Sequence, residues 1–166
     1  ASDDPKDPSL SEIGQTRAAR LAVILERMDA VYATRYRRTQ LTAAQVAAAN
    51  GLTTSTYDAA MPVEAFARKL RVAHPHDRVL VVGHSNTVSQ IAASLCDCNV
   101  EPLRDDEYDR MITVRIGGDG KALLLRNPGS RTERRRFQAQ GGFPQAGDEM
   151  APGQESGRRL ERSEVQ

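Results

Sequence analysis

Arg78-Val79-Leu80-Val81-Val82-Gly83-His84-Ser85-Asn86-Thr87 is the stretch from which the fold of this chain is predicted. Its residues from Val79 to Gly83 form a continuous apolar run, which is typical of a strand buried on both faces. A helical pattern begins just after Asn86, so His84 is predicted to lie where a strand ends and a helix begins. In open α/β sheets ligands bind at the carboxyl ends of strands, and a helix N-terminus favours anions. The junction therefore predicts an anion site, and phosphate is its natural ligand.

Two other interpretations of this stretch compete with a phosphate site. Gly83 to Thr87 differs from the G-x-S-x-G motif of serine hydrolases only in Thr87, which stands where that motif has its second glycine. A hydrolase of that kind needs a histidine after Ser85, but the chain's histidines are His74, His76 and His84. The remaining alternative is that His84 is a hydrogen-bonded residue at a strand end without a chemical role.

Two further segments bear on this choice. They are Leu10-Ser11-Glu12-Ile13-Gly14-Gln15-Thr16 and Val31-Tyr32-Ala33-Thr34-Arg35-Tyr36-Arg37-Arg38-Thr39-Gln40-Leu41-Thr42-Ala43. Together with Val81 to Thr87 they resemble, in order and spacing, the histidine phosphatase superfamily, also called phosphoglycerate mutase-like. The resemblance extends over about Asp4 to Arg126. One departure is large, because the family's Arg-His motif, on a first strand before the Leu10 segment, is not in this chain. His74 and His76 do not replace it, since they fall in a turn between a helix and a strand.

The resemblance implies an α/β domain, a three-layer α/β/α sandwich from which the first strand is missing. It implies a phosphomonoester hydrolase that works through a phosphohistidine, inactive as the chain stands because the attacking histidine is absent. The alternative is a non-catalytic phosphate-binding or interaction domain on the same fold. The implied ligand is a small phosphorylated substrate or inorganic phosphate, without a metal or other cofactor. The residues implied in catalysis are Arg38, His84 and Glu64, and those implied in substrate binding are Arg35, Ser85 and Asn86.

The role of proton donor to the leaving group is open between two carboxylates. Glu64 is predicted in the first turn of a helix, where it is a candidate general acid or simply complements the helix dipole. Asp58 is the second candidate general acid. Gly14 is equally open, either as a tolerated helix glycine or as a close approach to the site.

Three arginines, Arg35, Arg37 and Arg38, are predicted between the end of a strand and the start of a helix. Cations are disfavoured at the positive end of a helix dipole, so an anion between them would remove the conflict. The alternative interpretation is that the three arginines are solvated surface charges without a ligand. The match of Arg38-Thr39-x-x-Thr42-Ala43 to the family pattern singles out Arg38, whose planar guanidinium suits two phosphate oxygens. Arg37 is expected to point to solvent.

Composition limits the class of protein. The chain has 166 residues, 39% hydrophobic and 27% charged, which fits one soluble domain with a modest core and a tail. No apolar run is long enough to span a membrane, and the net charge of +1 suggests no nucleic-acid partner. Cys96 and Cys98 are too close and too few to imply a disulfide framework or a metal site. The chain opens on Ala1, so we expect truncation or processing, and its compartment is either the cytoplasm or outside it after removal of an upstream segment. Nothing in the sequence indicates an oligomeric state.

The periodicity predicts alternating helices and strands within a domain spanning 1–128. Ser9 or Ser11 is expected to cap the first helix, whose buried stripe is Ala18, Leu21, Leu25 and Met28. The other predicted elements are a strand at 30–33, a helix at about 37–50, an edge strand at 52–58, a helix after Pro62, the 79–83 strand, a helix at about 87–96 and a hairpin at 111–126. Residues 129–166 are poor in large apolar side chains and are expected to form a disordered polar tail.

Overall fold

The computed structural model describes residues 5–104 and 110–126, and it confirms the alternation of helices and strands. The predicted polar tail at 129–166 and the end of the acidic loop at 105–109 lie outside the described residues. In chain order the elements are α1 (Glu12–Ile24), β1 (Ala30–Thr34), α2 (Arg37–Ala49), β2 (Thr54–Tyr57), α3 (Val63–Ala73), β3 (Val79–Val82), α4 (Ser85–Cys96), β4 (Ile112–Ile116) and β5 (Ala122–Arg126).

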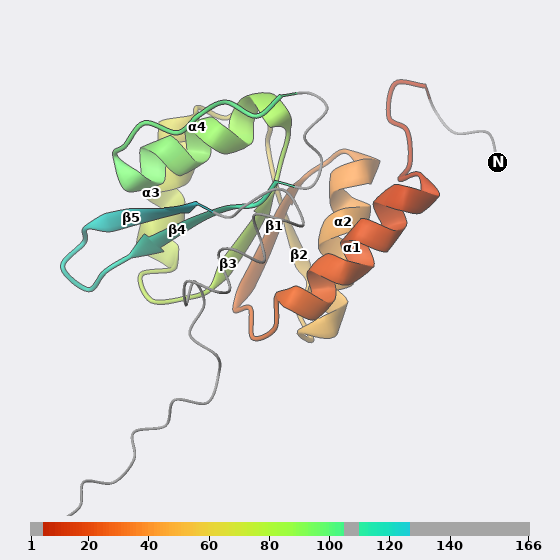
Figure 1. Ribbon diagram of the computed structural model, residues 1–166, viewed down its shortest axis with the longest axis horizontal. Coiled ribbons are helices and arrows are strands. Elements are labelled where there is room, and N and C mark those ends of the chain that lie inside the picture. The colour runs from red at the N-terminus through yellow and green to blue at the C-terminus, as the bar shows by residue number, and fades with distance from the viewer. Residues whose placement is uncertain (1–4, 105–109, 127–166) are drawn as a thin grey trace, which may run out of the picture.

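The main sheet is parallel, with strand order β2-β1-β3 (Figure 1). Its register places Val31 of β1 opposite Thr54 of β2 and Leu80 of β3. The predicted hairpin is confirmed, since β4 and β5 form a separate antiparallel pair around a turn at 117–121. β2 is an edge strand, as the sequence predicted.

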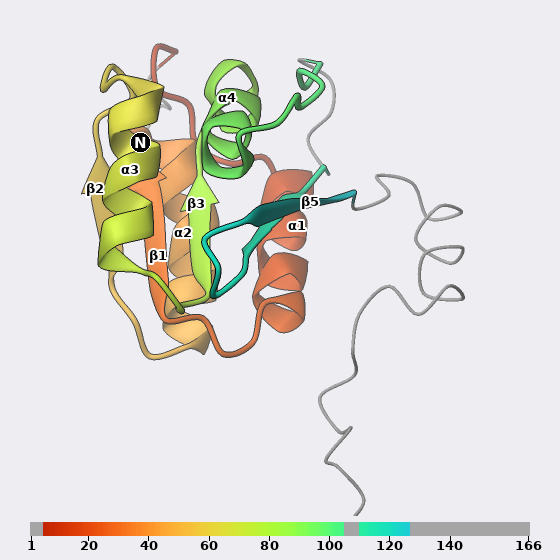
Figure 2. The same ribbon diagram turned by 90° about the vertical axis from the view of Figure 1, so that its left-hand side faces the viewer.

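Helices cover both faces of this sheet, with α1 and α2 on one side and α3 and α4 on the other (Figure 2). Successive side chains of a strand point to opposite faces, which divides the core into two parts. Val31 and Ala33 of β1 pack with Val46 of α2, and Leu21 of α1 packs against them. Leu25 and Met28, predicted on the same helix, reach this cluster from the segment after α1, because the helix ends at Ile24. On the other face, Tyr32 packs against a cluster formed by Tyr57, Phe66, Leu70 and Ile91.

The ends of the first two helices are fixed by local hydrogen bonds. Ser11, rather than Ser9, caps α1, because its Oγ accepts from the backbone N–H of Gly14 at 3.2 Å. A Cβ on Gly14 would meet Leu10, four residues earlier in the chain, at 3.1 Å, which favours the local role for this glycine. α2 ends at Ala49 with Asn50 as its C-cap residue, whose backbone N–H donates to carbonyls of the last turn, and Gly51 follows in the left-handed region at φ 66°.

Strand β3 differs from its predicted environment. Four consecutive apolar residues predicted burial on both faces, but all four are only half-buried. The physical reason is position: among the described residues β3 pairs only with β1, so its other edge has no neighbouring strand. The hairpin packs on α4 instead, through Ile112, Val114, Ala122 and Leu124.

The pairing of the two cysteines with each other was not predicted from the sequence. Cys96 and Cys98 form a disulfide across a Cα–Cα distance of 5.1 Å. Asp97 between them adopts a left-handed conformation, φ 50° and ψ 46°, which ends α4 and folds the chain back on itself. A spacing of one residue does not by itself predict this turn, since a non-glycine residue seldom adopts positive φ.

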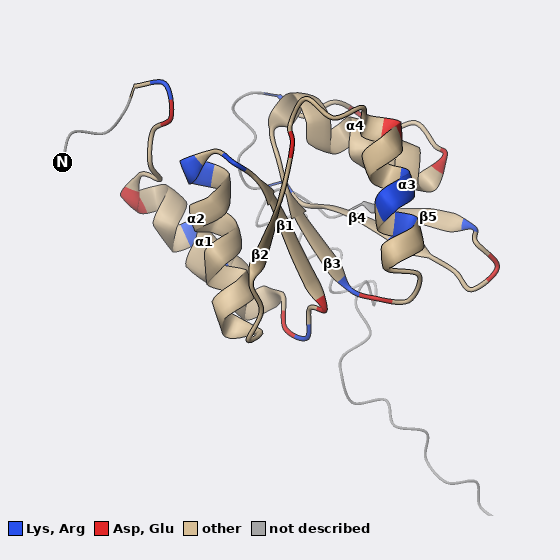
Figure 3. Cartoon of the chain, turned by 180° about the vertical axis from the view of Figure 1, so that it is seen from behind, with Lys and Arg blue, Asp and Glu red and all other residues tan. Residues whose placement is uncertain are grey.

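Charge is spread over the described surface. Figure 3 shows basic residues at the start of α2 and on α3, with acidic residues mainly in connecting segments. Within residues 5–104 and 110–126 no helix has both the length and the apolar character needed to cross a membrane.

Candidate functional site

The parallel sheet gathers three strand ends at one edge. β1 ends at Thr34, β2 ends at Tyr57 just before Asp58, and β3 is followed by Gly83 and His84. Parallel strands present their carboxyl ends at the same side of a sheet, which is where ligands bind in open α/β folds. The predicted site residues therefore come from three separate segments of the chain.

His84 is the N-cap residue of α4 and contacts two of these segments. Its Nε2 lies 3.0 Å from Oγ1 of Thr34, and its Nδ1 lies 3.3 Å from a terminal guanidinium nitrogen of Arg38. Arginine can only donate, so Nδ1 of the imidazole accepts and the ring proton belongs on Nε2, facing Thr34. The structure thus brings together Arg38 and His84, which lie 46 positions apart in the sequence.

A pair of buried threonines supports the histidine. Oγ1 of Thr34 lies 2.8 Å from Oγ1 of Thr39, and the Thr39 hydroxyl donates to the backbone carbonyls of Thr34 and Tyr36 at 3.0 and 2.8 Å. Thr34 is fully buried and Thr39 is 3% exposed, so these hydroxyls make their hydrogen bonds inside the protein. The chain of donors fixes the ring of His84 in one orientation.

The ring of Tyr36 completes the surroundings of His84. It meets the imidazole edge to face at a centroid distance of 5.0 Å. The guanidinium of Arg38 lies 4.9 Å from the same ring centroid, and that of Arg35 lies 5.8 Å from it. Both distances fall within the range of cation–π attraction. Tyr36 therefore positions Arg38 beside the histidine.

Burial lowers the pKa of His84, and the nearby positive charge of Arg38 lowers the pKa further. The imidazole is consequently neutral near pH 7, in agreement with its acceptor role toward Arg38. A bound anion would counter the effect of Arg38. The pair thus has one fixed positive charge and one neutral group that is able to take up a proton.

The other two arginines differ from Arg38. Arg35 and Arg37 are exposed, whereas Arg38 is half-buried. Asp7 supplies a negative charge at the N-terminus of α2, where its Oδ1 accepts from the backbone N–H of Arg37 at 2.9 Å. This carboxylate partly offsets the unfavourable placement of basic residues at the positive end of the helix dipole. The sequence had predicted an external anion for that purpose and missed Asp7.

The structure does not bring either predicted general acid into contact with His84 among the described residues. Glu64 is exposed in the first turn of α3, which begins after β2. Asp58 is also exposed, and its Oδ1 accepts from the backbone N–H of Ala60 at 2.9 Å. Ser85 and Asn86 lie at the first turn of α4, half-buried and exposed respectively.

Sequence reasoning missed Thr34 and Tyr36 as site residues and cited Thr39 only as part of a pattern. A signal existed for Thr34, since it is the last residue of a predicted apolar strand. The signal was weak because threonine is common in strands, and only the pairing of β1 with β3 places its hydroxyl beside His84.

Tyr57 leaves a buried hydroxyl next to this site. Its Oη has no hydrogen-bond partner among the described residues, and burial raises the pKa of Tyr57 to about 12. A water-sized cavity of about 10 Å³ lies between the end of β2, α3 and α4, lined by Tyr57, Asp58 and Thr87 among others. One ordered water could satisfy the hydroxyl there.

Within the described residues no three His, Cys, Asp or Glu side chains gather closely enough to hold an ion.

A family model bears on the first part of this arrangement. The model of the histidine phosphatase superfamily (branch 1) matches residues 3–61. That segment contains Thr34, Arg38 and Thr39 and ends before His84. No match was found among curated proteins.

Solved structures show a similar fold. A mycobacterial glucosyl-3-phosphoglycerate phosphatase in complex with VO3 aligns with a TM-score of 0.56 at 14% identity, covering 77% of this chain and 90% of that protein. A structure described as mycobacterial hydrolase 2 aligns with a TM-score of 0.52 at 13% identity, covering 83% of this chain and 89% of the other. At such low identity these likenesses concern the fold, which is mixed α/β with a parallel sheet.

Proposed function

We propose that this chain contributes the phosphate-binding part of a phosphomonoester hydrolase of the histidine phosphatase type. The observation that carries the proposal is the 3.3 Å contact between Arg38 and His84 at the carboxyl edge of the sheet. The family model over residues 3–61 and the fold shared with a phosphatase structure that holds VO3 support it. Vanadate is an analogue of phosphate.

Each group has a distinct role in this scheme. Arg38 binds two phosphoryl oxygens through its guanidinium, and His84 takes up a proton and donates to a third oxygen. Ser85 and Asn86 lie at the N-terminal turn of α4, whose free N–H groups add a partial positive charge. Arg35, exposed at the end of β1, attracts the anion. Together these groups stabilise the charge of the transition state.

The reaction is a double displacement. A histidine nitrogen attacks phosphorus and the ester P–O bond breaks, while a carboxylic acid gives the leaving oxygen its proton. Water then attacks the phosphohistidine, and the P–N bond breaks to release phosphate. Asp58 is a candidate proton donor because it follows β2 at the same edge of the sheet, and Glu64 is one because α3 begins near that edge. Residues 1–166 contain no Arg-His motif, so this chain provides no histidine for the attacking role in this scheme.

The edge of β3 that has no partner strand among the described residues supports the matching proposal about the fold. Its apolar residues are half-buried although their pattern suits an interior strand. A further strand beside β3, carrying the nucleophile, would cover them and complete a three-layer α/β/α sandwich. The chain as it stands would then be inactive.

A non-catalytic phosphate-binding or interaction domain is the second candidate. It is favoured by one observation, the absence of an Arg-His motif from the sequence. Both candidates predict phosphate binding, and they differ only in turnover once a nucleophile is supplied. A serine hydrolase is not supported, because no histidine follows Ser85.

Titration of this chain with vanadate or inorganic phosphate tests the proposal. Arg38→Ala removes a charge-assisted hydrogen bond of about 1.5–3 kcal/mol, so we expect the dissociation constant to rise about 10- to 100-fold. Arg37→Ala is the matched control, since it removes the same charge from an exposed neighbouring position. Equal losses from both substitutions would show that the arginines act only as diffuse charge.

A further inference from the structure

An open groove runs along α4, starting directly after His84. Its volume is about 370 Å³, at the lower end of the range of roughly 300–1,000 Å³ found for small-molecule sites. One wall is a single face of α4, formed by Ser85, Asn86, Ser89, Gln90 and Ala93. This wall extends about 12 Å from the N-terminus of the helix, given a rise of 1.5 Å per residue.

The opposite wall is the segment that returns over α4 after the helix ends (Figure 1). It contributes Val100, Pro102 and Leu103, which are apolar. Val100 is 9% exposed because it also belongs to the core under the hairpin. The wall is therefore anchored to the body of the protein.

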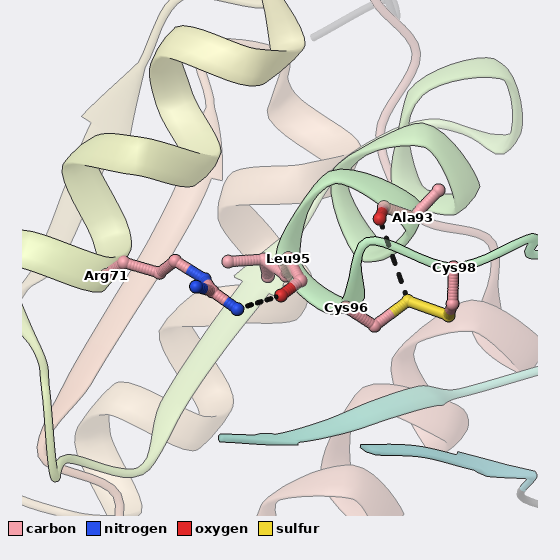
Figure 4. Close-up of a disulfide and its surroundings, with 5 residues drawn as sticks. All are labelled: Arg71, Ala93, Leu95, Cys96 and Cys98. Carbon is pink, nitrogen blue, oxygen red and sulfur yellow. Dashed lines mark hydrogen bonds between the residues drawn. A yellow bond between two sulfur atoms is a disulfide. The ribbon is translucent and has the colours of Figure 1, made fainter. Parts of the chain in front are cut away.

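Two devices hold the returning segment in place. The Cys96–Cys98 disulfide and the left-handed Asp97 turn the chain back at the end of α4 (Figure 4). At the other end of the segment, the backbone N–H of Leu103 donates to Oγ of the buried Ser89 at 3.2 Å. Nearby, Arg71 donates to the carbonyl of Leu95 at 2.6 Å and so holds the last turn of α4.

The lining of the groove selects for one kind of chemistry. No charged side chain is among the described residues that line it. The α4 wall offers hydroxyl and amide groups that can both donate and accept, and the other wall offers an apolar surface. A compact polyol or monosaccharide has hydroxyls on its edge and C–H groups on its face, and it matches both walls. A charged alcohol would lose hydration there without gaining a partner.

We propose that this groove binds the leaving group of the phosphoester, and that the leaving group is an uncharged polyhydroxylated alcohol about the size of one sugar ring. The inference rests on the proposed function, because it places the phosphoryl group at Arg38 and His84. The ester oxygen then lies near Ser85 and Asn86, and the alcohol follows α4 toward Ala93.

Calorimetric titration of the full chain with three phosphate monoesters tests this inference. We expect glucose 1-phosphate to bind about tenfold more tightly than methyl phosphate, a difference of about 1.4 kcal/mol. 3-Phosphoglycerate, whose alcohol carries a carboxylate, should show no such gain. If glucose 1-phosphate and methyl phosphate bind equally, or if 3-phosphoglycerate gains as much, the inference is wrong while phosphate binding stands. If none of the three binds, the proposed function itself fails.

Variants of α4 and of the returning segment test whether the gain in affinity for glucose 1-phosphate arises in the groove. Ala93→Leu fills the far end of the groove and should remove the gain for glucose 1-phosphate while leaving methyl phosphate unchanged. Gln90→Ala, at an exposed position, should reduce the gain in affinity for glucose 1-phosphate. This variant provides the test if Ala93→Leu does not fold. Ser94→Ala is the control, since Ser94 lies on the same helix but does not line the groove. Cys98→Ser should also reduce the gain by releasing the returning segment. A gain that survives all three groove variants would overturn the proposal.

Discussion

His84 is held as a neutral imidazole by partners on two other elements. Arg38 of α2 donates to Nδ1, and Oγ1 of Thr34 in β1 accepts a hydrogen bond from the N–H at Nε2. Arg38 is the charged group that contacts the ring among the described residues. A cation next to a group that can become cationic is unfavourable unless an anion lies between them. The arrangement is therefore better suited to the proposed anion site than to a structural ion pair.

The lowered pKa of His84 predicts how stability depends on pH. The pKa in the folded chain lies below the usual value of about 6.5, so the unfolded chain takes up the proton first as pH falls. The stability that neutral His84 contributes is therefore present above pH 6.5 and is lost as pH drops from there toward the lowered pKa. Thermal melts between pH 7.5 and 5 should show a steeper decline for the wild type than for His84→Gln, which cannot be protonated. Parallel declines would contradict the assignment of the neutral state.

The sequence predicted His84 and Arg38 but not what surrounds them. Both residues are of types whose chemistry is recognisable in a motif. The role of Thr34 depends on the pairing of β1 with β3, which connects positions about 50 residues apart, and a local pattern does not contain that information. Asp7 was missed for a similar reason, since its capping bond reaches α2 from 30 positions away.

At the level of elements, the contact between the end of β3 and the end of β2 is unusually close. A Cβ on Gly83 would lie 2.6 Å from Oη of Tyr57 and 3.0 Å from Cγ2 of Val88. The Tyr57 ring cannot move aside easily, because it is 7% exposed and stacks on Phe66 at a centroid distance of 4.2 Å. Glycine at this position lets α4 begin directly above the sheet and so places His84.

A double-mutant cycle tests this contact. Gly83→Ala should destabilise the protein by about 1–3 kcal/mol through overpacking. Tyr57→Phe alone should be neutral or slightly stabilising, because it removes a buried hydroxyl that lacks a partner among the described residues. Combined, the two substitutions should cost less than Gly83→Ala alone, since the clash with Oη is gone. If the changes in the free energy of unfolding, measured by urea denaturation, are simply additive, the Tyr57 hydroxyl is not what excludes a Cβ at position 83.

Most elements could be predicted from hydrophobic periodicity, and the exceptions have physical causes. β1, α2 and the hairpin were placed within a few residues, because their patterns are strong and end at turn residues such as Gly51 and Gly117. The burial of β3 was overestimated, since a sequence does not state how many neighbours a strand has. The Cys96–Cys98 disulfide depends on a left-handed Asp97, a conformation that aspartate adopts only where its surroundings favour it.

For the whole molecule, the described chain consists of a parallel sheet with helices on both faces and a hairpin attached through α4. The free edge of β3 lies between these two parts of the fold. β3 is short, as edge strands commonly are, but its four residues are apolar and only half-buried, whereas exposed edges usually carry charged residues or are covered. His84 follows directly after the end of β3, so a strand added beside β3 would bring its own side chains near the proposed phosphate site.

Adding that strand should therefore change both activity and stability. We expect residues 1–166 to hydrolyse p-nitrophenyl phosphate at no measurable rate, because Arg38 and His84 alone provide electrostatic stabilisation without a nucleophile. A version extended by an upstream strand with an Arg-His motif should turn over and should melt at a higher temperature. Covering unsatisfied polar groups is worth about 1–3 kcal/mol each, against a usual total stability of roughly 5–15 kcal/mol.

Substitutions in the extended version separate the two candidate functions. His84→Ala should lower its turnover by about 10²–10³, the usual cost of losing one hydrogen bond to a transition-state oxyanion, whereas Ser85→Ala should be mild. An extended chain that binds vanadate but does not turn over would favour the non-catalytic domain. Robust turnover by the short chain would refute the need for an external nucleophile. If residues 1–166 melt as cooperatively and at as high a temperature as the extended version, the proposal of a missing strand is wrong, because the edge of β3 would then not lower stability.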